Sequence, residues 1–155
     1  MGLYNNIMVG TENLSHATED YLKAIYELEK DSKPVSTNKL AKKMGFAPAS
    51  ITGMLKKISL NSPDLINYQS RKGVFLTEIG EKIALEIVRH HRLIELYLTE
   101  ALGYESDQVH DEADRLEHVI SEEFEDKISS ILGNPKIDPH GEPIPTKDGK
   151  IIKNN

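Results

Sequence analysis

The chain has 155 residues, of which 38% are hydrophobic and 28% are charged, and no apolar run approaches the 18 residues of a membrane span, so we expect none. It contains no cysteine, which excludes disulfides and thiolate metal sites and fits a cytoplasmic location. The net charge of −6 is divided unevenly: residues 33–76 hold seven Lys and one Arg against one acid, whereas residues 77–132 hold 15 acids against five bases.

The first half of the chain predicts three helices followed by a β-hairpin. Ser36 or Thr37 can cap the second helix, and the strands flank a polar, glycine-containing turn. Helix, turn, helix and hairpin is the order of a winged helix-turn-helix, which binds DNA. The expected elements are the helices His16–Lys30, Thr37–Met44 and Pro48–Ile58 and the strands Leu65–Tyr68 and Val74–Leu76.

The third helix is the expected recognition helix, because its first residues are small or hydroxylated and allow close approach to a major groove. Lysines around it, and the basic hairpin tip, can meet phosphates. A module that only binds protein is the alternative. The expected groove contacts are Ala47, Pro48, Ala49, Ser50 and Thr52, and the expected phosphate contacts are Lys39, Lys42, Lys43, Lys56, Lys57, Arg71 and Lys72.

The second half predicts further helices and an irregular end. We expect a long helix from Thr77 to Leu102, then Ser106–Ile120 and Ser121–Leu132, and a Pro/Gly-rich tail. The expected organisation is a winged helix-turn-helix domain over 1–76, an all-helical dimerisation and metal-binding domain over 77–135, and a tail over 136–155. Apolar residues in the middle segment exceed the needs of one small core, which favours a homodimer.

Acidic and imidazole side chains in the second half have the spacing of metal ligands. His110, Asp114, Glu117 and His118 share about a 100° arc if they lie on one helix. His91 and Glu95 form an i, i+4 pair upstream, whereas His90 points about 100° away and is expected to face solvent. The alternative is that these residues form an ordinary solvent-exposed polar surface that binds no metal.

Several segments resemble the diphtheria toxin repressor and manganese transport regulator family of bacterial metal-dependent repressors. The resemblance spans about residues 15–146 in one collinear order. The matching segments are Thr18–Leu22, Ile25–Glu29, Arg89–Leu93, Val109–Ala113, Leu116–Val119 and Gly141–Pro145.

This resemblance implies a homodimer that binds a palindromic double-stranded DNA operator, with two metal positions per subunit and no enzymatic activity. One position would use Asp20, Asp114, Glu117 and His118, and the other would use His91, Glu95 and His110. Carboxylates at 20 and 114 replace the Met and Cys of the iron-responsive branch and favour Mn(II), with Fe(II) second. Lys23 stands where the manganese branch has a Glu. Because a lysine ammonium cannot bind a metal ion, the closely spaced pair of metals found in that branch is not expected here.

Three other functions remain open from the residues alone. A winged-helix regulator could respond to an organic ligand and use no metal. A carboxylate/His metalloenzyme could share the ligand types, although neither His-Glu-x-x-His nor paired Glu-x-x-His occurs. A metal-buffering protein could have lost DNA binding. His140 in the tail is expected to be exposed.

Overall fold

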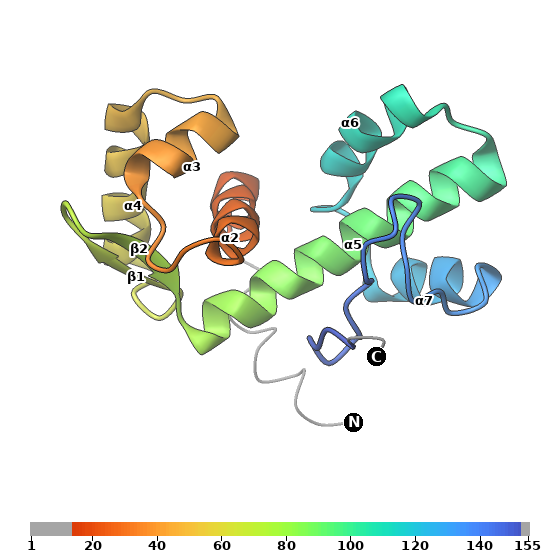
Figure 1. Ribbon diagram of the computed structural model, residues 1–155. Coiled ribbons are helices and arrows are strands. Elements are labelled where there is room, and N and C mark those ends of the chain that lie inside the picture. The colour runs from red at the N-terminus through yellow and green to blue at the C-terminus, as the bar shows by residue number, and fades with distance from the viewer. Residues whose placement is uncertain (1–13, 153–155) are drawn as a thin grey trace. The chain divides into compact units, whose positions relative to one another are not determined.

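The computed structural model describes residues 14–152, which form helices and one small sheet (Figure 1). This is the mostly helical fold that the sequence predicts. In chain order the elements are α2 (His16–Glu29), α3 (Thr37–Met44), α4 (Pro48–Asn61), β1 (Ile66–Gln69), β2 (Gly73–Leu76), α5 (Glu78–Leu102), α6 (Ser106–Leu116) and α7 (Glu122–Ile131).

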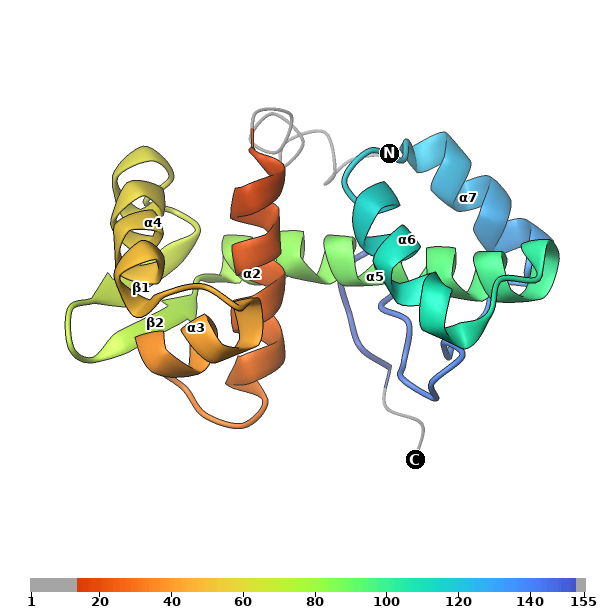
Figure 2. The same ribbon diagram turned by 90° about the horizontal axis from the view of Figure 1, so that it is seen from above.

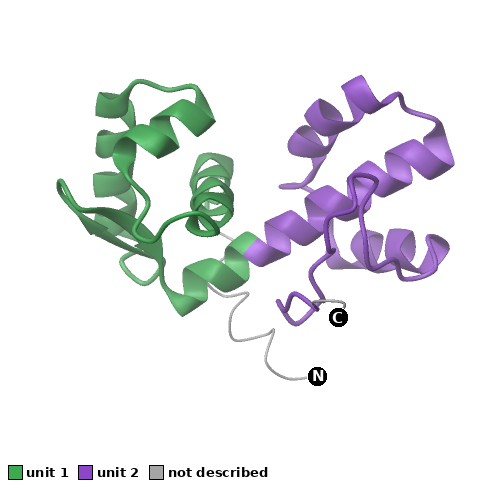
Figure 3. Ribbon diagram, in the orientation of Figure 1, with its two compact units in different colours: residues 1–84 green, residues 85–155 purple. Residues whose placement is uncertain are grey.

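The chain divides into two compact units, one up to residue 84 and one from residue 85 (Figure 3). Helix α5 begins in the first unit and continues in the second. None of the helices in the described range 14–152 is both long and apolar enough to cross a membrane.

Local capping explains where the first helices begin and end. The hydroxyl of Ser15 accepts a hydrogen bond from the Thr18 N–H, and Ser36 does the same for the Lys39 N–H. Gly45 ends α3 in the left-handed conformation, with φ of 71°. Pro48 occupies the first turn of α4, where its missing N–H costs no hydrogen bond. Each of these signals is readable in the sequence.

The two strands pair antiparallel, with Ile66 opposite Leu76 and Gln69 opposite Gly73. Gly73 has φ of 110°, and a Cβ there would lie 2.4 Å from the carbonyl oxygen of Val35. Val35 pairs with Val74 in an isolated bridge, so only glycine permits this approach. The hairpin lies beside α4 in both views (Figures 1 and 2).

Each unit has its own hydrophobic core. In the first, Leu22, Ile25, Leu40, Ile51 and Leu55 are fully buried, so one face of each of the three helices meets at a common centre. In the second, the core is formed mainly by α5 and α6, with one residue from α7 and one from the tail. Its buried members are Leu93, Ile94, Leu96, Leu98, Val109, Ala113, Ile128 and Ile144.

Candidate metal centre and nucleic-acid interface

Helix α5 supplies two buried polar side chains one turn apart. His91 is 6% exposed and Glu95 is 2% exposed, and Nε2 of His91 lies 3.1 Å from Oε1 of Glu95. Residues at i and i+4 share a helix face, which explains this pairing. An imidazole and a carboxylate therefore share one site on α5.

Helix α6 supplies His110 and Asp114 through the same spacing. Nε2 of His110 lies 3.5 Å from Oδ2 of Asp114, and both side chains are largely exposed. Nδ1 of His110 lies 3.1 Å from Oε1 of Glu95 on α5. The two helices thus bring their i, i+4 pairs together.

Glu117 and His118 lie in a turn after α6, so the predicted continuation of this helix to Ile120 is wrong. The N–H of Glu117 still bonds to the carbonyl of Ala113 at 2.9 Å, which keeps its backbone near helical geometry. Its carboxylate is 1% exposed and lies 3.5 Å from Nε2 of His118. Of the four ligands predicted to share one helix, His110 and Asp114 therefore lie on α6, and the other two follow its end.

His91 is the centre of this cluster. Its Nδ1 lies 2.5 Å from Oε2 of Glu117 and 3.2 Å from Oδ1 of Asp114. Its Nε2 faces Glu95 and also lies 3.2 Å from Nδ1 of His110. One ring therefore touches members of both predicted ligand sets. Six of the seven predicted ligands form one connected group in the second unit: His91, Glu95, His110, Asp114, Glu117 and His118.

The donor set fits a divalent transition metal. Ligand atoms of His91, His110 and Asp114 all lie within 4.8 Å of one another. Burial favours a higher pKa for Glu95, but hydrogen bonds from His91 and His110 and the charge of His140 lower its pKa overall. A carboxylate that is ionised and imidazoles that can lose a proton are what metal binding requires.

Asp20, the remaining predicted ligand, lies on α2 in the first unit, and its side chain is exposed. Helical spacing places it on α2 away from the buried Leu22 and Ile25. Asp20 is therefore not part of the core of the first unit.

His140 is exposed as predicted, but its position adds a donor that the sequence did not reveal. Its Nε2 lies 3.7 Å from Oε1 of Glu95. Oδ1 of Asp138 accepts the N–H groups of His140 and Glu142, each at 2.8 Å, and so closes the turn. The Asp-Pro-His-Gly run predicts a turn, but not where that turn meets α5.

The prediction that His90 faces solvent is wrong. It is 6% exposed, and its Nδ1 donates to the carbonyl of Glu117 at 3.0 Å while Nε2 lies 2.9 Å from Oε2 of Glu125. The helical wheel separates His90 from His91 correctly, but α7 supplies a partner for that side. Burial lowers the pKa of His90, yet the hydrogen bond and charge of Glu125 raise it overall.

The predicted DNA contacts lie in the first unit on α3, at the start and middle of α4, and at the hairpin tip. All are exposed except Thr52, which is partly buried. Nζ of Lys43 pairs with Glu27 at 2.5 Å, and Nζ of Lys39 donates to Ser32 at 2.9 Å. These two lysines already have partners, whereas within residues 14–152 neither Lys56 nor Lys72 forms an ion pair.

Two features of this surface were not predicted. Phe46, two residues before α4, is 54% exposed, although phenylalanine usually contributes to a core. Arg71 at the hairpin tip has φ of 67°, an uncommon conformation for a residue with a side chain. An aromatic ring beside Ala47 extends the small apolar surface at the start of α4.

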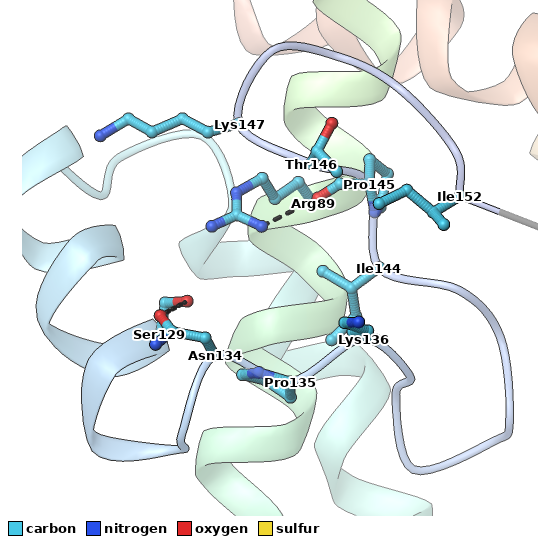
Figure 4. A pocket seen from close by; sticks show the side chains of 10 residues that line it. All are labelled: Arg89, Ser129, Asn134, Pro135, Lys136, Ile144, Pro145, Thr146, Lys147 and Ile152. Atoms are coloured by element: carbon cyan, nitrogen blue, oxygen red, sulfur yellow. Dashed lines mark hydrogen bonds between the residues drawn. The ribbon is translucent and has the colours of Figure 1, made fainter. Parts of the chain in front are cut away.

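A pocket of about 240 Å³ lies elsewhere in the second unit, between α5, α7 and the tail (Figure 4). Its wall includes Arg89, Lys136 and Lys147 beside Ile144 and Pro145. Arg89 is already engaged, because it donates to Glu125 and, at 2.8 Å, to the carbonyl of Pro145.

Two family models match nearly the whole described chain. The model of the iron dependent repressor N-terminal DNA binding domain matches residues 13–74. The model of the iron dependent repressor metal binding and dimerisation domain matches residues 77–146.

Curated relatives show the same likeness. The chain is 32% identical over 132 residues to the iron-dependent repressor IdeR of Mycobacterium tuberculosis, covering 85% of this chain and 56% of that protein. It is 31% identical over 144 residues to the diphtheria toxin repressor of Corynebacterium diphtheriae, covering 93% and 63% respectively. The chain thus spans about three fifths of these relatives.

Solved structures agree in fold. A manganese-dependent transcriptional repressor in complex with manganese has a TM-score of 0.79 and 38% identity, over 88% of this chain and 62% of that one. The manganese regulator SloR has a TM-score of 0.77 and 37% identity, with the same coverage of 88% and 62%.

Proposed function

The chain belongs to the iron-dependent repressor family, and from this premise we propose that it is a metal-dependent, DNA-binding transcriptional repressor of metal homeostasis. The observation that carries the proposal is the connected group of imidazoles and carboxylates around His91. The first unit has an exposed basic surface around α4, and the second unit has this group of metal-ligand side chains. Together they are the parts that a metal-controlled DNA-binding protein needs.

We propose that the ligands act in two sets. Asp20 would share one ion with Asp114, Glu117 and His118, and His91, Glu95 and His110 would hold another. The contacts of His91 with Glu117 and Asp114 support a close relation between the sets. His140 is a candidate additional donor to the second set because it lies 3.7 Å from Glu95.

The switch follows from where the ligands lie in the sequence. Asp20 belongs to the DNA-binding unit and its partners to the other, so a shared ion would fix the two units in one orientation. Without bound metal, the carboxylates of Asp20, Asp114 and Glu117 would repel one another. A bound cation supplies the positive charge that removes this repulsion. Metal and DNA would then bind with reciprocal positive coupling of about 1–3 kcal/mol.

Manganese is the proposed metal and Fe(II) the second choice. The donors are oxygen and nitrogen, with Asp at positions 20 and 114, and hard carboxylates suit Mn(II). The manganese-bound repressor structure that this chain resembles supports the same choice.

We propose a homodimer as the DNA-binding form. Val119, Phe124 and Ile131 are 62%, 45% and 71% exposed around α7, and exposed apolar side chains of this kind suit a second copy. A two-fold dimer would present two α4 helices to a palindromic operator. The proposed role is regulatory rather than enzymatic.

A selection experiment tests the function. The full chain, stripped with chelator, is offered a library of random duplexes in the presence of Mn(II), Fe(II), Zn(II) or no metal. Enrichment of one palindromic sequence with Mn(II) or Fe(II), but not without metal, is expected. Enrichment that is independent of metal, or none under any condition, would overturn the proposal.

A further inference from the structure

We propose that His90, fixed by Glu125, is a positioning residue that orients the Glu117–His118 segment for metal binding. The proposal rests on the proposed metal function, in which Glu117 and His118 are ligands. The starting observation is that buried His90 contacts a backbone atom of Glu117 rather than its carboxylate.

The turn after α6 is where such support is needed. The final carbonyls of a helix have no partner within it, and Glu117 is the C-cap residue of α6. Nδ1 of His90 donates to the carbonyl of Glu117 at 3.0 Å and satisfies this buried acceptor. A carbonyl only accepts, so this ring nitrogen carries the hydrogen.

Holding this carbonyl fixes two ligands together. The C=O of Glu117 and the N–H of His118 belong to one planar peptide group. When His90 fixes the plane of that group, it also fixes the directions in which both side chains leave the backbone. His90 therefore acts on two ligands without touching a metal.

The imidazole of His90 is itself held from its other side. Nε2 lies 2.9 Å from Oε2 of Glu125 on α7, whose side chain is 4% exposed. Arg89 donates to the other oxygen of Glu125. It also donates, at 2.8 Å, to the carbonyl of Pro145 (Figure 4). Helix α5, the turn, α7 and the tail are thereby joined by consecutive hydrogen bonds in one unit. A ring bonded at both nitrogens has little freedom to rotate.

Two substitutions separate the contacts of His90. The amide nitrogen of Asn can take the place of Nδ1, so His90→Asn keeps a donor toward Glu117. His90→Gln reaches the position of Nε2 instead and keeps the contact with Glu125. Both remove one hydrogen bond of the ring, so they form a matched pair for effects on folding stability.

The test measures Mn(II) binding to the full chain by calorimetry and by electron paramagnetic resonance, with urea unfolding in parallel. Loss of an outer contact to a metal site typically weakens affinity by about 10–100-fold, which is the expected effect of His90→Gln. His90→Asn is expected to lose less than the about 10-fold lower end of that range, since it keeps the Glu117 contact. Equal affinities for the two variants would overturn the proposal.

Glu117→Ala distinguishes failure of this inference from failure of the function. If the wild type binds no Mn(II), or Glu117→Ala binds it equally well, the proposed metal function is wrong and the positioning role falls with it. If Glu117→Ala loses an equivalent of Mn(II) while His90→Gln does not weaken it, only the positioning role is wrong. Should His90→Gln fail to fold, His90→Ala, which also removes the donor to Glu117, is compared with Glu125→Ala, which keeps that donor. His90→Ala is expected to weaken the same equivalent and Glu125→Ala is not; equal affinities would contradict the proposal.

Discussion

Nδ1 of His91 lies 2.5 Å from Oε2 of Glu117, although the two residues are 26 positions apart in the sequence. His91 lies on α5, and Glu117 lies in the turn after α6. The opposite nitrogen of the same ring faces Glu95 and His110. His91 thus joins the donors of α5, α6 and the following turn. A change at either proposed ligand set is expected to influence the other through this ring.

Asp20→Ala is expected to abolish the stimulation of DNA binding by metal while leaving the dimer intact. The exposed carboxylate on α2 is the only proposed ligand from the DNA-binding unit, so its loss would uncouple that unit from the metal. Sedimentation gives the oligomeric state, and fluorescence anisotropy gives the affinity for operator DNA with and without Mn(II).

Asp31→Ala is the matched control for charge, because Asp31 is an exposed acid shortly after the same helix. It is expected to keep the response to Mn(II). A variant at Asp20 that still responds as strongly as the control would contradict the bridging role.

Lys72→Ala is expected to weaken binding to all duplexes similarly and to reduce the dependence on salt. Lys72 is exposed at the hairpin tip, where a phosphate contact would release one counterion. The slope of log affinity against log salt concentration should fall by about 1. Lys127→Ala, in α7 and paired with Glu123, is the control; an equal change in both slopes would argue against a contact at the hairpin.

Gly80→Ala and Gly53→Ala are expected to change stability in opposite directions. A Cβ at Gly80 would lie 2.0 Å from the carbonyl oxygen of Leu65, and such overpacking costs about 1–3 kcal/mol. Nothing lies within 4 Å of a Cβ at Gly53 in α4, where alanine gains about 1 kcal/mol of helix propensity. Urea unfolding in chelator measures both, and destabilisation of equal size would contradict the close contact of Gly80 with Leu65 and the open space at Gly53.

The folding contribution of Glu125 is expected to depend on pH. Burial raises the pKa of this carboxyl, but His90 and Arg89 lower it overall below the ordinary 4.5. A lowered pKa in the folded state stabilises the protein above the unfolded value, and this stabilisation is lost as pH falls through the folded pKa. The free energy of unfolding of the wild type relative to Glu125→Gln should therefore shrink below about pH 4.5.

Unfolding is measured in chelator so that metal release does not contribute. Glu123→Gln, on the exposed side of the same helix, is the control, since its carboxylate is 81% exposed beside Lys127. A difference between wild type and Glu125→Gln that grows on acidification would contradict the sign of the pKa shift.

The sequence predicted most of the fold because its signals are local. Ser15, Ser36 and Gly45 mark helix ends through contacts within a few residues. The hairpin and α5 follow from equally short patterns. Helix α6 ended earlier than its pattern implied, and Glu117 there contacts His90 and His91 on α5, 27 and 26 positions away, instead of continuing the helix.

The candidate site was predictable where ligand spacing is helical. His91 with Glu95 and His110 with Asp114 are i, i+4 pairs, and the structure brings both together. His90 was misassigned because a helical wheel gives its direction but not the presence of Glu125 on α7. The approach of His140 to Glu95 depends on tail packing over 45 positions, which no local pattern reports.

The affinity of the full chain for its selected operator duplex, measured by anisotropy at fixed salt with and without Mn(II), tests the central claim most directly. Coupling of about 1–3 kcal/mol predicts that Mn(II) tightens DNA binding by about 5–150-fold, and that DNA tightens Mn(II) binding by the same factor. Equal DNA affinity in the two conditions, in a protein shown by calorimetry to hold Mn(II), would contradict it.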